Sequence, residues 1–526
     1  MSAAARQGRD RRARVLPAAP GRPAFDRSAF DRSGPGGTAA PRVAVVGGGI
    51  AGLAAATGLA ERGVRVTVYE REPQLGGRLA GWPVRLRDGS PATMSRGFHA
   101  FFRQYYNLRG LLRRIDPLLT GLRGLPDYPL QHSGGARDSF AHVPRTPPFS
   151  ALGFAALSPT FGLRDLAGMA PRAALPLLDV RVPEVYERWD GTAAQELLTA
   201  IRFPEAARDL AFEVFSRSFF ADPGALSAAE MALMFHIYFL GSSEGLLFDV
   251  PAEPYPRALW EPLGDYLEKL GVRLRTGEPV LGIRPEGGAR IVSTAAGEEH
   301  CAAVVLALDT AGLRTVAAAS PRLADAAWRE RVSRLRTAPP FLVSRLWLDR
   351  PVARRRPGFL GTSGYGPLDN VSVLERWETE AARWAARTGG SVVELHAYAV
   401  DPAAARQPRT REQVQERLRG ELARVYPETA AARVLDACHE WRADCPLFPV
   451  GGYRDRPAVR TPDPRLVVAG DLVRTGLPVA LMERAATSGL LAANVLLARW
   501  GVRGHPLRTV PDRGRSALLR SLARLG

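Results

Sequence analysis

Three glycines and one acidic residue near the start of the chain have the spacing of a dinucleotide-binding site. Gly47, Gly49 and Gly52, with Ala51 among them, form the pattern G-x-G-x-x-G, and Glu70 follows further along the chain. Glycines at these places allow a tight turn, a close approach of the backbone to a pyrophosphate, and close packing of a helix on a strand. An acid at this distance can bind ribose hydroxyls. These residues predict the binding of a nucleotide cofactor.

A histidine among aromatic residues follows this motif, in the stretch MSRGFHAFFRQYYNL that begins at Met94. Imidazole titrates near neutral pH, so His99 is the candidate general base. The alternative is a histidine that orders the cofactor or satisfies a backbone carbonyl. We expect the neighbouring aromatic residues to line an apolar substrate pocket, and packing in the core is the alternative. The expected pocket residues are Phe101, Phe102, Tyr105 and Tyr106.

The elements needed to position the glycines arrive in the order of a Rossmann unit. Residues 43–46 predict a buried strand, an alanine-rich helix follows the glycines, and residues 64–69 predict a second strand that ends at Glu70. The N-terminus of such a helix faces the phosphates of the cofactor. Strand, glycines, helix, strand and acid together are much more specific than the glycine motif alone.

Two remote motifs identify the cofactor through a resemblance. REPQLGGRLAGW places Gly77 and Arg78 just after the acid, and RLVVAGDLVRTGLP places Gly470 and Asp471 near the other end of the chain. This pair resembles the superfamily of FAD-dependent amine oxidases and carotene desaturases. The resemblance implies that Asp471 binds the ribityl–phosphate part of FAD and that the next helix points its N-terminus at the flavin. The implied FAD-binding residues are Gly47, Gly49, Ala51, Gly52, Glu70, Arg71, Gly77, Arg78, Gly97, Phe98, Val280, Gly470, Asp471 and Met482.

The aromatic stretch narrows the resemblance to one branch. Its pattern G-x-H-x-F-F-x-x-Y-x-N is similar to plant-type phytoene and zeta-carotene desaturases, and the longer string MSRGFHAFFRQYYNLRGLLRRIDP is closer to the carotenoid aromatic-ring synthases. That branch implies oxidation of a β-ionone ring, with migration of one methyl group, to an aromatic φ end group. The alternatives are a desaturase without methyl migration and a non-catalytic isoprenoid-binding protein on the same scaffold.

The same resemblance implies an α/β fold with a discontinuous FAD-binding domain. This Rossmann-like domain would consist of residues 41–115, 255–335 and 460–500. The inserts 116–254 and 336–459 would form an α+β substrate-binding domain. We expect residues 1–40 to be a disordered basic tail and residues 501–526 to be a second basic tail.

Charge and composition bear on partners and compartment. The chain has 526 residues and a formal net charge of +18. Eight arginines and three aspartates give residues 1–40 a charge of +5, and seven arginines and one aspartate give residues 499–526 a charge of +6. Because the body is only mildly basic, we expect no nucleic acid as partner. The two basic tails suggest an anionic membrane surface instead, with simple solubility and disorder as the alternative. Three cysteines cannot form a disulfide framework, which indicates the cytoplasm, and the scattered histidines predict no metal site.

Two segments could dock a cytoplasmic, peripheral enzyme on the membrane where a carotenoid substrate would be found. Leu518, Leu519, Leu522 and Leu525 would fall on one face of a helix, with arginines beside them for lipid headgroups. The alternatives are an ordinary surface helix packed on the body, and docking through the apolar stretch from Pro147 to Met169. By analogy with plant desaturases, a membrane quinone is the expected electron acceptor.

Overall fold

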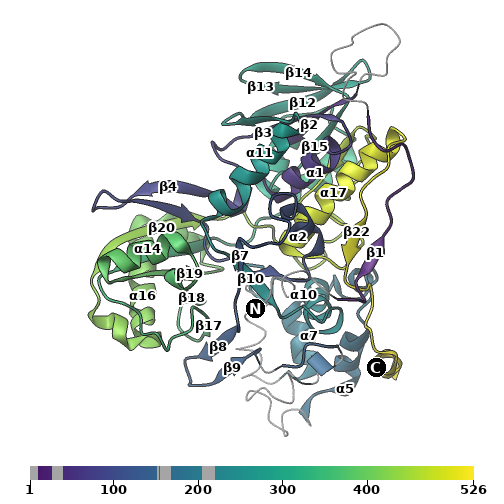
Figure 1. The fold of residues 1–526 in the computed structure, drawn as a ribbon. Helices are drawn as coiled ribbons and strands as arrows, with labels where there is room; N and C mark the ends of the chain where they lie inside the picture. Colours follow the sequence, from purple (N-terminus) through teal and green to yellow (C-terminus); the bar gives the residue numbers. More distant parts are fainter. Residues whose placement is uncertain are drawn as a thin grey trace.

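The computed structural model describes residues 10–25, 40–141, 143–147, 149–150, 153, 168–203 and 219–525 (Figure 1). A five-stranded parallel sheet lies at the centre of one part, in the order β11-β3-β2-β15-β21. Its strands come from three remote segments, within the ranges 41–115, 255–335 and 460–500. The strands are β2 (Arg42–Val46), β3 (Arg65–Glu70), β11 (Arg273–Thr276), β15 (Ala303–Leu306) and β21 (Leu466–Val468).

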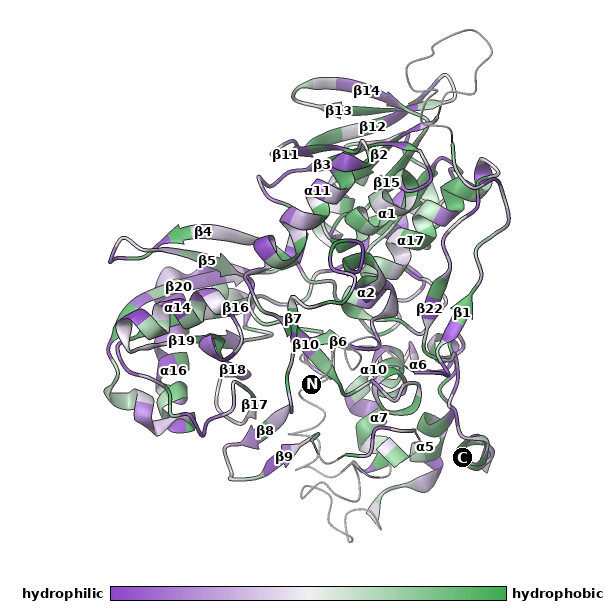
Figure 2. Ribbon diagram, viewed as in Figure 1, coloured by the Kyte–Doolittle hydropathy of each residue, from purple (hydrophilic) through white to green (hydrophobic). Residues whose placement is uncertain are grey.

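Two helices of this part pack against each other through small residues. Every residue of α1 (Ile50–Ala60) is buried, and α17 (Leu481–Arg499) lies beside it. A Cβ atom at Gly489 would lie 2.2 Å from the Ala51 carbonyl oxygen, so glycine permits this close approach. Strands β2 and β15 and helix α1 are predominantly apolar, as expected of elements covered on both faces (Figure 2).

A seven-stranded sheet forms the second part, in the order β20-β16-β19-β18-β17-β8-β9. Its strands come from residues 129–139 and 341–442. They are β8 (Pro129–His132), β9 (Arg137–Ser139), β16 (Phe341–Leu348), β17 (Phe359–Ser363), β18 (Asn370–Val373), β19 (Ser391–Ala397) and β20 (Val434–Arg442).

The two faces of this sheet are used differently. Along β16 and β19, Leu346 and Leu395 pack in one apolar cluster with residues of α16 (Pro408–Val425). Alternate residues point to the opposite face, where Trp347 packs with Trp384 of α14 (Thr379–Thr388). The charged residues of β16 and β19 lie on this second face, which meets the segment carrying His99.

A third region consists of helices and a small antiparallel sheet. Helices α6 (Val185–Trp189), α7 (Ala194–Ile201) and α10 (Ala228–Phe235) share one core. The sheet β6-β10-β7 joins β6 (Phe101–Phe102), β10 (Phe248–Pro251) and β7 (Leu122–Gly124). The aromatic stretch therefore forms a short strand and then helix α2 (Tyr106–Leu112).

The prediction of a disordered N-terminal tail is wrong for residues 10–25. Strand β1 (Arg14–Leu16) pairs antiparallel with β22 (Leu507–Thr509), and Asp10 forms a buried ion pair with Arg515. Composition suggested disorder because a polar segment buries little apolar surface, but this segment obtains its contacts from the far end of the chain. Residues 1–9 and 26–39 lie outside the described part.

The C-terminal leucines do not share one exposed face. Helix α18 (Ala517–Leu522) contacts the segment Leu175–Asp179. Leu519 is 7% exposed and packs on the body, whereas Leu518 is 70% exposed. Among the described residues, no helix has the length and apolar character needed to cross a membrane.

Candidate flavin site and active site

The glycine motif forms a turn between β2 and α1 that other residues could not adopt without clashes. Gly47 has a φ of +114°, and a Cβ there would lie 2.2 Å from the Ala307 carbonyl oxygen. A Cβ at Gly52 would lie 1.9 Å from the Gly47 carbonyl oxygen. Helix α1 begins after Gly49, and in the described structure no side chain caps its N-terminus. Its first N–H groups are thus available to a phosphate.

Glu70 is held over this turn by backbone donors. Its carboxylate accepts hydrogen bonds from the N–H of Gly48 at 2.7 Å and from the N–H of Glu72 at 2.9 Å. The side chain therefore has a fixed position at the carboxyl end of β3, where a ribose would lie. Arg71 is exposed and pairs with Asp309, with Nη2 3.6 Å from Oδ2.

The second glycine motif lies against the first. A Cβ at Gly77 would lie 3.0 Å from the Cα of Gly49. Arg78 then reaches Asp471, with Nη2 2.6 Å from Oδ1. Burial disfavours the charged guanidinium, but Asp471 outweighs burial and holds the pKa of Arg78 above its usual value. The two remote motifs that suggested FAD are thus joined by an ion pair.

Helix α17 connects the Asp471 turn to the aromatic stretch. Gly470 donates its N–H to the hydroxyl of Ser488 at 2.9 Å, which fixes the turn on the helix. The Glu483 carboxyl group accepts from the N–H groups of Asn107 and Leu108 at 2.8 and 2.9 Å. Burial raises the pKa of Glu483 to about 8. This carboxyl group caps α2 and sets the position of the segment that follows His99.

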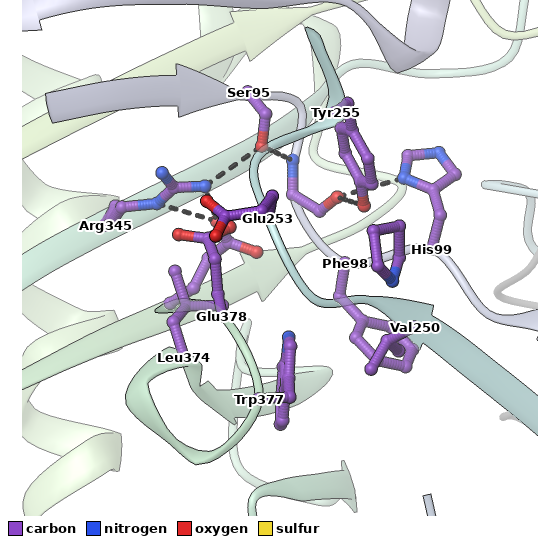
Figure 3. Close-up of a pocket in the computed structure, with 13 residues that line it drawn as sticks. Ser95, Phe98, His99, Val250, Glu253, Tyr255, Arg345, Leu374, Trp377 and Glu378 are labelled. Atoms are coloured by element: carbon purple, nitrogen blue, oxygen red, sulfur yellow. Dashed lines mark hydrogen bonds and ion pairs between the residues drawn. The ribbon is translucent and has the colours of Figure 1, made fainter. Parts of the chain in front are cut away.

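His99 binds a backbone carbonyl in the same segment. The Gly97 carbonyl oxygen lies 3.0 Å from His99 Nδ1 and accepts from the Tyr255 hydroxyl at 2.8 Å (Figure 3). A carbonyl only accepts, so Nδ1 carries the proton and Nε2 has the lone pair. Burial lowers the pKa of His99 to about 4, so the ring is neutral at pH 7.

The comparisons with known proteins decide the family. Residues 50–497 match the family model described as flavin-containing amine oxidoreductase. The chain belongs to this family. A carotenoid φ-ring synthase from Streptomyces griseus is 70% identical, with 99% of this chain and 98% of the relative covered. A carotenoid φ-ring synthase from Chlorobaculum tepidum is 27% identical, with 91% of each chain covered.

A solved structure shows the same fold. The putative protoporphyrinogen oxidase from Exiguobacterium superposes with a TM-score of 0.62 at 17% identity, covering 88% of this chain and 100% of that one. The chain is therefore an FAD-dependent oxidoreductase with an amine-oxidase-type fold. The predictions of this fold, of the superfamily and of FAD as cofactor are confirmed.

The flavin oxidoreductase has a cradle that fits FAD. The close approach of Gly49 and Gly77 leaves backbone where side chains would otherwise stand, and Glu70, Arg78 and Asp471 surround it. These residues would hold FAD. Val280 is the first residue of strand β12 (Val280–Glu286). Two residues earlier, the Glu278 N–H donates to the Glu70 carbonyl oxygen at 2.9 Å, which holds this segment beside Glu70.

Two further residues predicted to bind FAD lie close to this region. Met482 is at the start of α17 and is partly buried. The Phe98 side chain stacks on Phe359 with ring centroids 4.2 Å apart, and Phe98 lines the same pocket as His99 (Figure 3).

The four aromatic residues predicted to line the substrate pocket are divided by the structure. Phe101, Tyr105 and Tyr106 are buried in packing, and the hydroxyl groups of Tyr105 and Tyr238 lie 3.1 Å apart. Phe102 is only partly buried, with its ring 4.7 Å from that of Tyr238. Phe102 and Tyr105 lie side by side, with ring centroids 5.5 Å apart, and the lining of a substrate pocket by these four residues stays a prediction. Phe102 is the member with partly exposed surface.

Several residues beside His99 were missed by the sequence analysis. The pocket in Figure 3 is lined by His99, Tyr255, Arg345, Glu378 and Glu394, among others. Burial raises the pKa of Glu378 to about 7. Glu394 and the next alternate residues of β19 form the pattern E-x-H-x-Y, which on a strand places polar groups on one face. This short alternation is the feature of the sequence that could have indicated a polar face on this strand.

Proposed function

We propose that this flavoenzyme oxidises the β-ionone ring of a carotenoid, with migration of one methyl group, to an aromatic φ end group. The observation that carries the proposal is the 70% identity to a carotenoid φ-ring synthase over 99% of the chain. Bound FAD supplies an acceptor for hydride. A plain desaturase reaction would leave the methyl pattern unchanged, and a non-catalytic binding protein would not need the Arg78–Asp471 cradle.

The residues of the chain position the ring and control water. Gly97 holds His99 through its carbonyl oxygen, and Phe102 offers an aromatic face. An aromatic face stabilises cationic character in a ring by about 2 kcal/mol when water is excluded. His99 as general base remains a prediction, and its hydrogen bond to Gly97 equally suits the alternative of a satisfied carbonyl.

The proposal includes work at a membrane surface in the cytoplasm. Burying each CH₂ group of a carotenoid is worth about 0.8 kcal/mol, so passage through water is strongly unfavourable. Two exposed apolar residues support docking: Leu518 on α18, and Phe149, which is 61% exposed. Most of the apolar stretch after Phe149 lies outside the described residues. An anionic lipid surface and a membrane quinone are the proposed partners.

Reconstitution tests the proposed activity. Purified flavin-loaded protein is mixed anaerobically with liposomes that contain β-carotene, and flavin absorbance is followed with a quinone added afterwards. We expect bleaching of the flavin by β-carotene, reoxidation by the quinone, and an aryl carotenoid among the extracted pigments. A flavin that stays oxidised under these conditions would contradict the proposal.

A further inference from the structure

A chain of hydrogen bonds crosses the sheet face next to Gly97. Glu394 and His396 point to the same side of β19, and Tyr398 follows directly after the strand. Arg345 Nε and Nη2 donate to Glu394 Oε2 at 3.0 and 2.7 Å. Glu394 Oε1 lies 2.9 Å from His396 Nε2, and His396 Nδ1 lies 2.6 Å from the Tyr398 hydroxyl.

The charge of Glu394 fixes the direction of each hydrogen bond. Burial would raise the pKa of Glu394, but Arg345 and His396 hold it at about 2. The carboxylate can therefore only accept, so His396 Nε2 carries the proton toward Glu394 and does not accept from the Phe98 N–H, which lies 3.4 Å away. Nδ1 then accepts from Tyr398. Asn370 Nδ2 donates to the Tyr398 hydroxyl at 3.0 Å. Within the described part of the chain, one lone pair on the phenol oxygen remains for a further proton.

The order hydroxyl, imidazole, carboxylate is the order used by enzymes that pass a hydroxyl proton to histidine. In such arrangements the carboxylate orients the ring and stabilises the imidazolium that forms. Burial raises the pKa of Tyr398 above its usual value, so the phenol keeps its proton until it receives another. The chain thus suits a relay, in which Tyr398 gains one proton as it gives one away.

His396 stands directly against the segment that carries His99. A Cβ atom at Gly97 would lie 2.4 Å from His396 Cε1, so only glycine leaves room for the ring. The charge of Arg78, and a proton on His396, would both disfavour a charge on His99, so the relay, His99 and the Arg78–Asp471 pair lie in one neighbourhood. The Tyr398 ring is partly exposed, and Phe220 meets it edge-on with centroids 4.7 Å apart.

The relay offers a hydrogen-bonded carboxylate for an accepted proton, which His99 lacks. Among the described residues, the hydrogen bond of His99 goes to a neutral carbonyl, so a proton on His99 would gain no hydrogen-bonded carboxylate. A proton on His396 would gain the ion pair with Glu394. We propose that Tyr398, His396 and Glu394 form the relay that accepts the proton released when the oxidised ring becomes an arene.

This inference rests on the proposed function. A β-ionone ring that becomes a φ ring loses four hydrogens, as two hydrides and two protons. Bound FAD would accept each hydride, and the quinone proposed above would reoxidise it in between. After the second hydride has left, the ring carries cationic character. One C–H bond then breaks, its electron pair enters the ring as a double bond, and the proton goes to the Tyr398 oxygen. The proton of the Tyr398 hydroxyl passes to His396 Nδ1, and the imidazolium pairs with Glu394.

Tyr398→Phe tests the relay, with Tyr426→Phe as matched control. The Tyr426 hydroxyl donates to the Pro357 carbonyl oxygen at 3.3 Å, away from the relay. We expect Tyr398→Phe to keep its flavin, to lose roughly a hundredfold in turnover, and to lose the solvent deuterium isotope effect of the wild type. His396→Gln, which can still donate to Glu394 but cannot carry the proton, should give the same loss. The control should match the wild type.

Two results would overturn the relay. The first is wild-type turnover or an unchanged isotope effect in Tyr398→Phe and His396→Gln. The second is loss of flavin from both variants, which would mean a structural role. If the wild type itself makes no aryl carotenoid, the proposed function fails; if the wild type does and Tyr398→Phe does equally well, only the relay fails.

Discussion

Replacement of Gly97 by alanine should destabilise the protein for two reasons: it strains the backbone, and it displaces His396 of the relay. Gly97 has a φ of +86°, and a Cβ there would lie 2.4 Å from Cε1 and 2.5 Å from Nε2 of His396. The imidazole must move, and its hydrogen bonds to Glu394 and Tyr398, of 2.9 and 2.6 Å, would be lost or stretched.

The magnitude follows from three contributions. A non-glycine residue in the left-handed region costs about 1–3 kcal/mol. The hydrogen bond to the Glu394 carboxylate is worth about 1.5–3 kcal/mol and that to the Tyr398 hydroxyl about 0.5–1.5 kcal/mol. Gly97→Ala should therefore lower the free energy of unfolding by about 3–7.5 kcal/mol.

Gly135→Ala separates the two effects. Gly135 has a φ of +94°, and no described residue lies within 4 Å of the position its Cβ would take, so only the backbone cost applies. Urea unfolding of both flavin-loaded variants, followed by circular dichroism, should show Gly97→Ala to be less stable by about 2–4 kcal/mol. Equal stability of the two variants would refute the close packing of His396 on Gly97.

Three further predictions concern the cofactor, pH and the membrane. Glu70→Ala and Asp471→Ala should each weaken FAD binding by at least about tenfold, because each removes a charge-assisted partner. Retained flavin after dialysis measures this, with the half-buried Glu72→Ala as control. Arg456 and Arg484 outweigh the effect of burial and hold the pKa of Glu230 at about 2, below its usual 4.5. The ionised Glu230 therefore stabilises the folded protein fully above pH 4.5, and this stabilisation is lost as the pH falls toward 2. Unfolding between those pH values should show a flatter slope in Glu230→Gln than in the wild type; identical slopes would contradict the pair. Leu518→Glu should reduce co-sedimentation with anionic liposomes most clearly at low salt, whereas Leu281→Glu, at a site 56% exposed on β12, should not.

The nucleotide-binding part of the fold was visible in the sequence because its signals are local. Glycines, an apolar strand and an acid follow one another in order around Gly47, and their meaning does not depend on distant residues. The Arg78–Asp471 pair could be predicted only through the resemblance to a family, because the spacing of two remote motifs does not show that their residues meet.

The rest depends on contacts between distant segments. Glu483 caps α2 from the far end of the chain, and Asp10 pairs with Arg515. Neither partner carries a local pattern that identifies the other. Composition therefore predicted a disordered tail, whereas pairing with β22 orders residues 14–16. Helical spacing predicted a shared face of leucines, whereas Leu519 packs on the body.

Pigment analysis in a β-carotene-producing host tests the central claim most directly. Expression of the chain should shift the pigment to aryl carotenoids, with hydrogen lost, all carbons retained and one methyl group moved to the neighbouring ring position, as measured by mass spectrometry and NMR. Pigments with additional double bonds but an unmoved methyl group, or unchanged β-carotene in cells that contain the flavin-loaded protein, would contradict it.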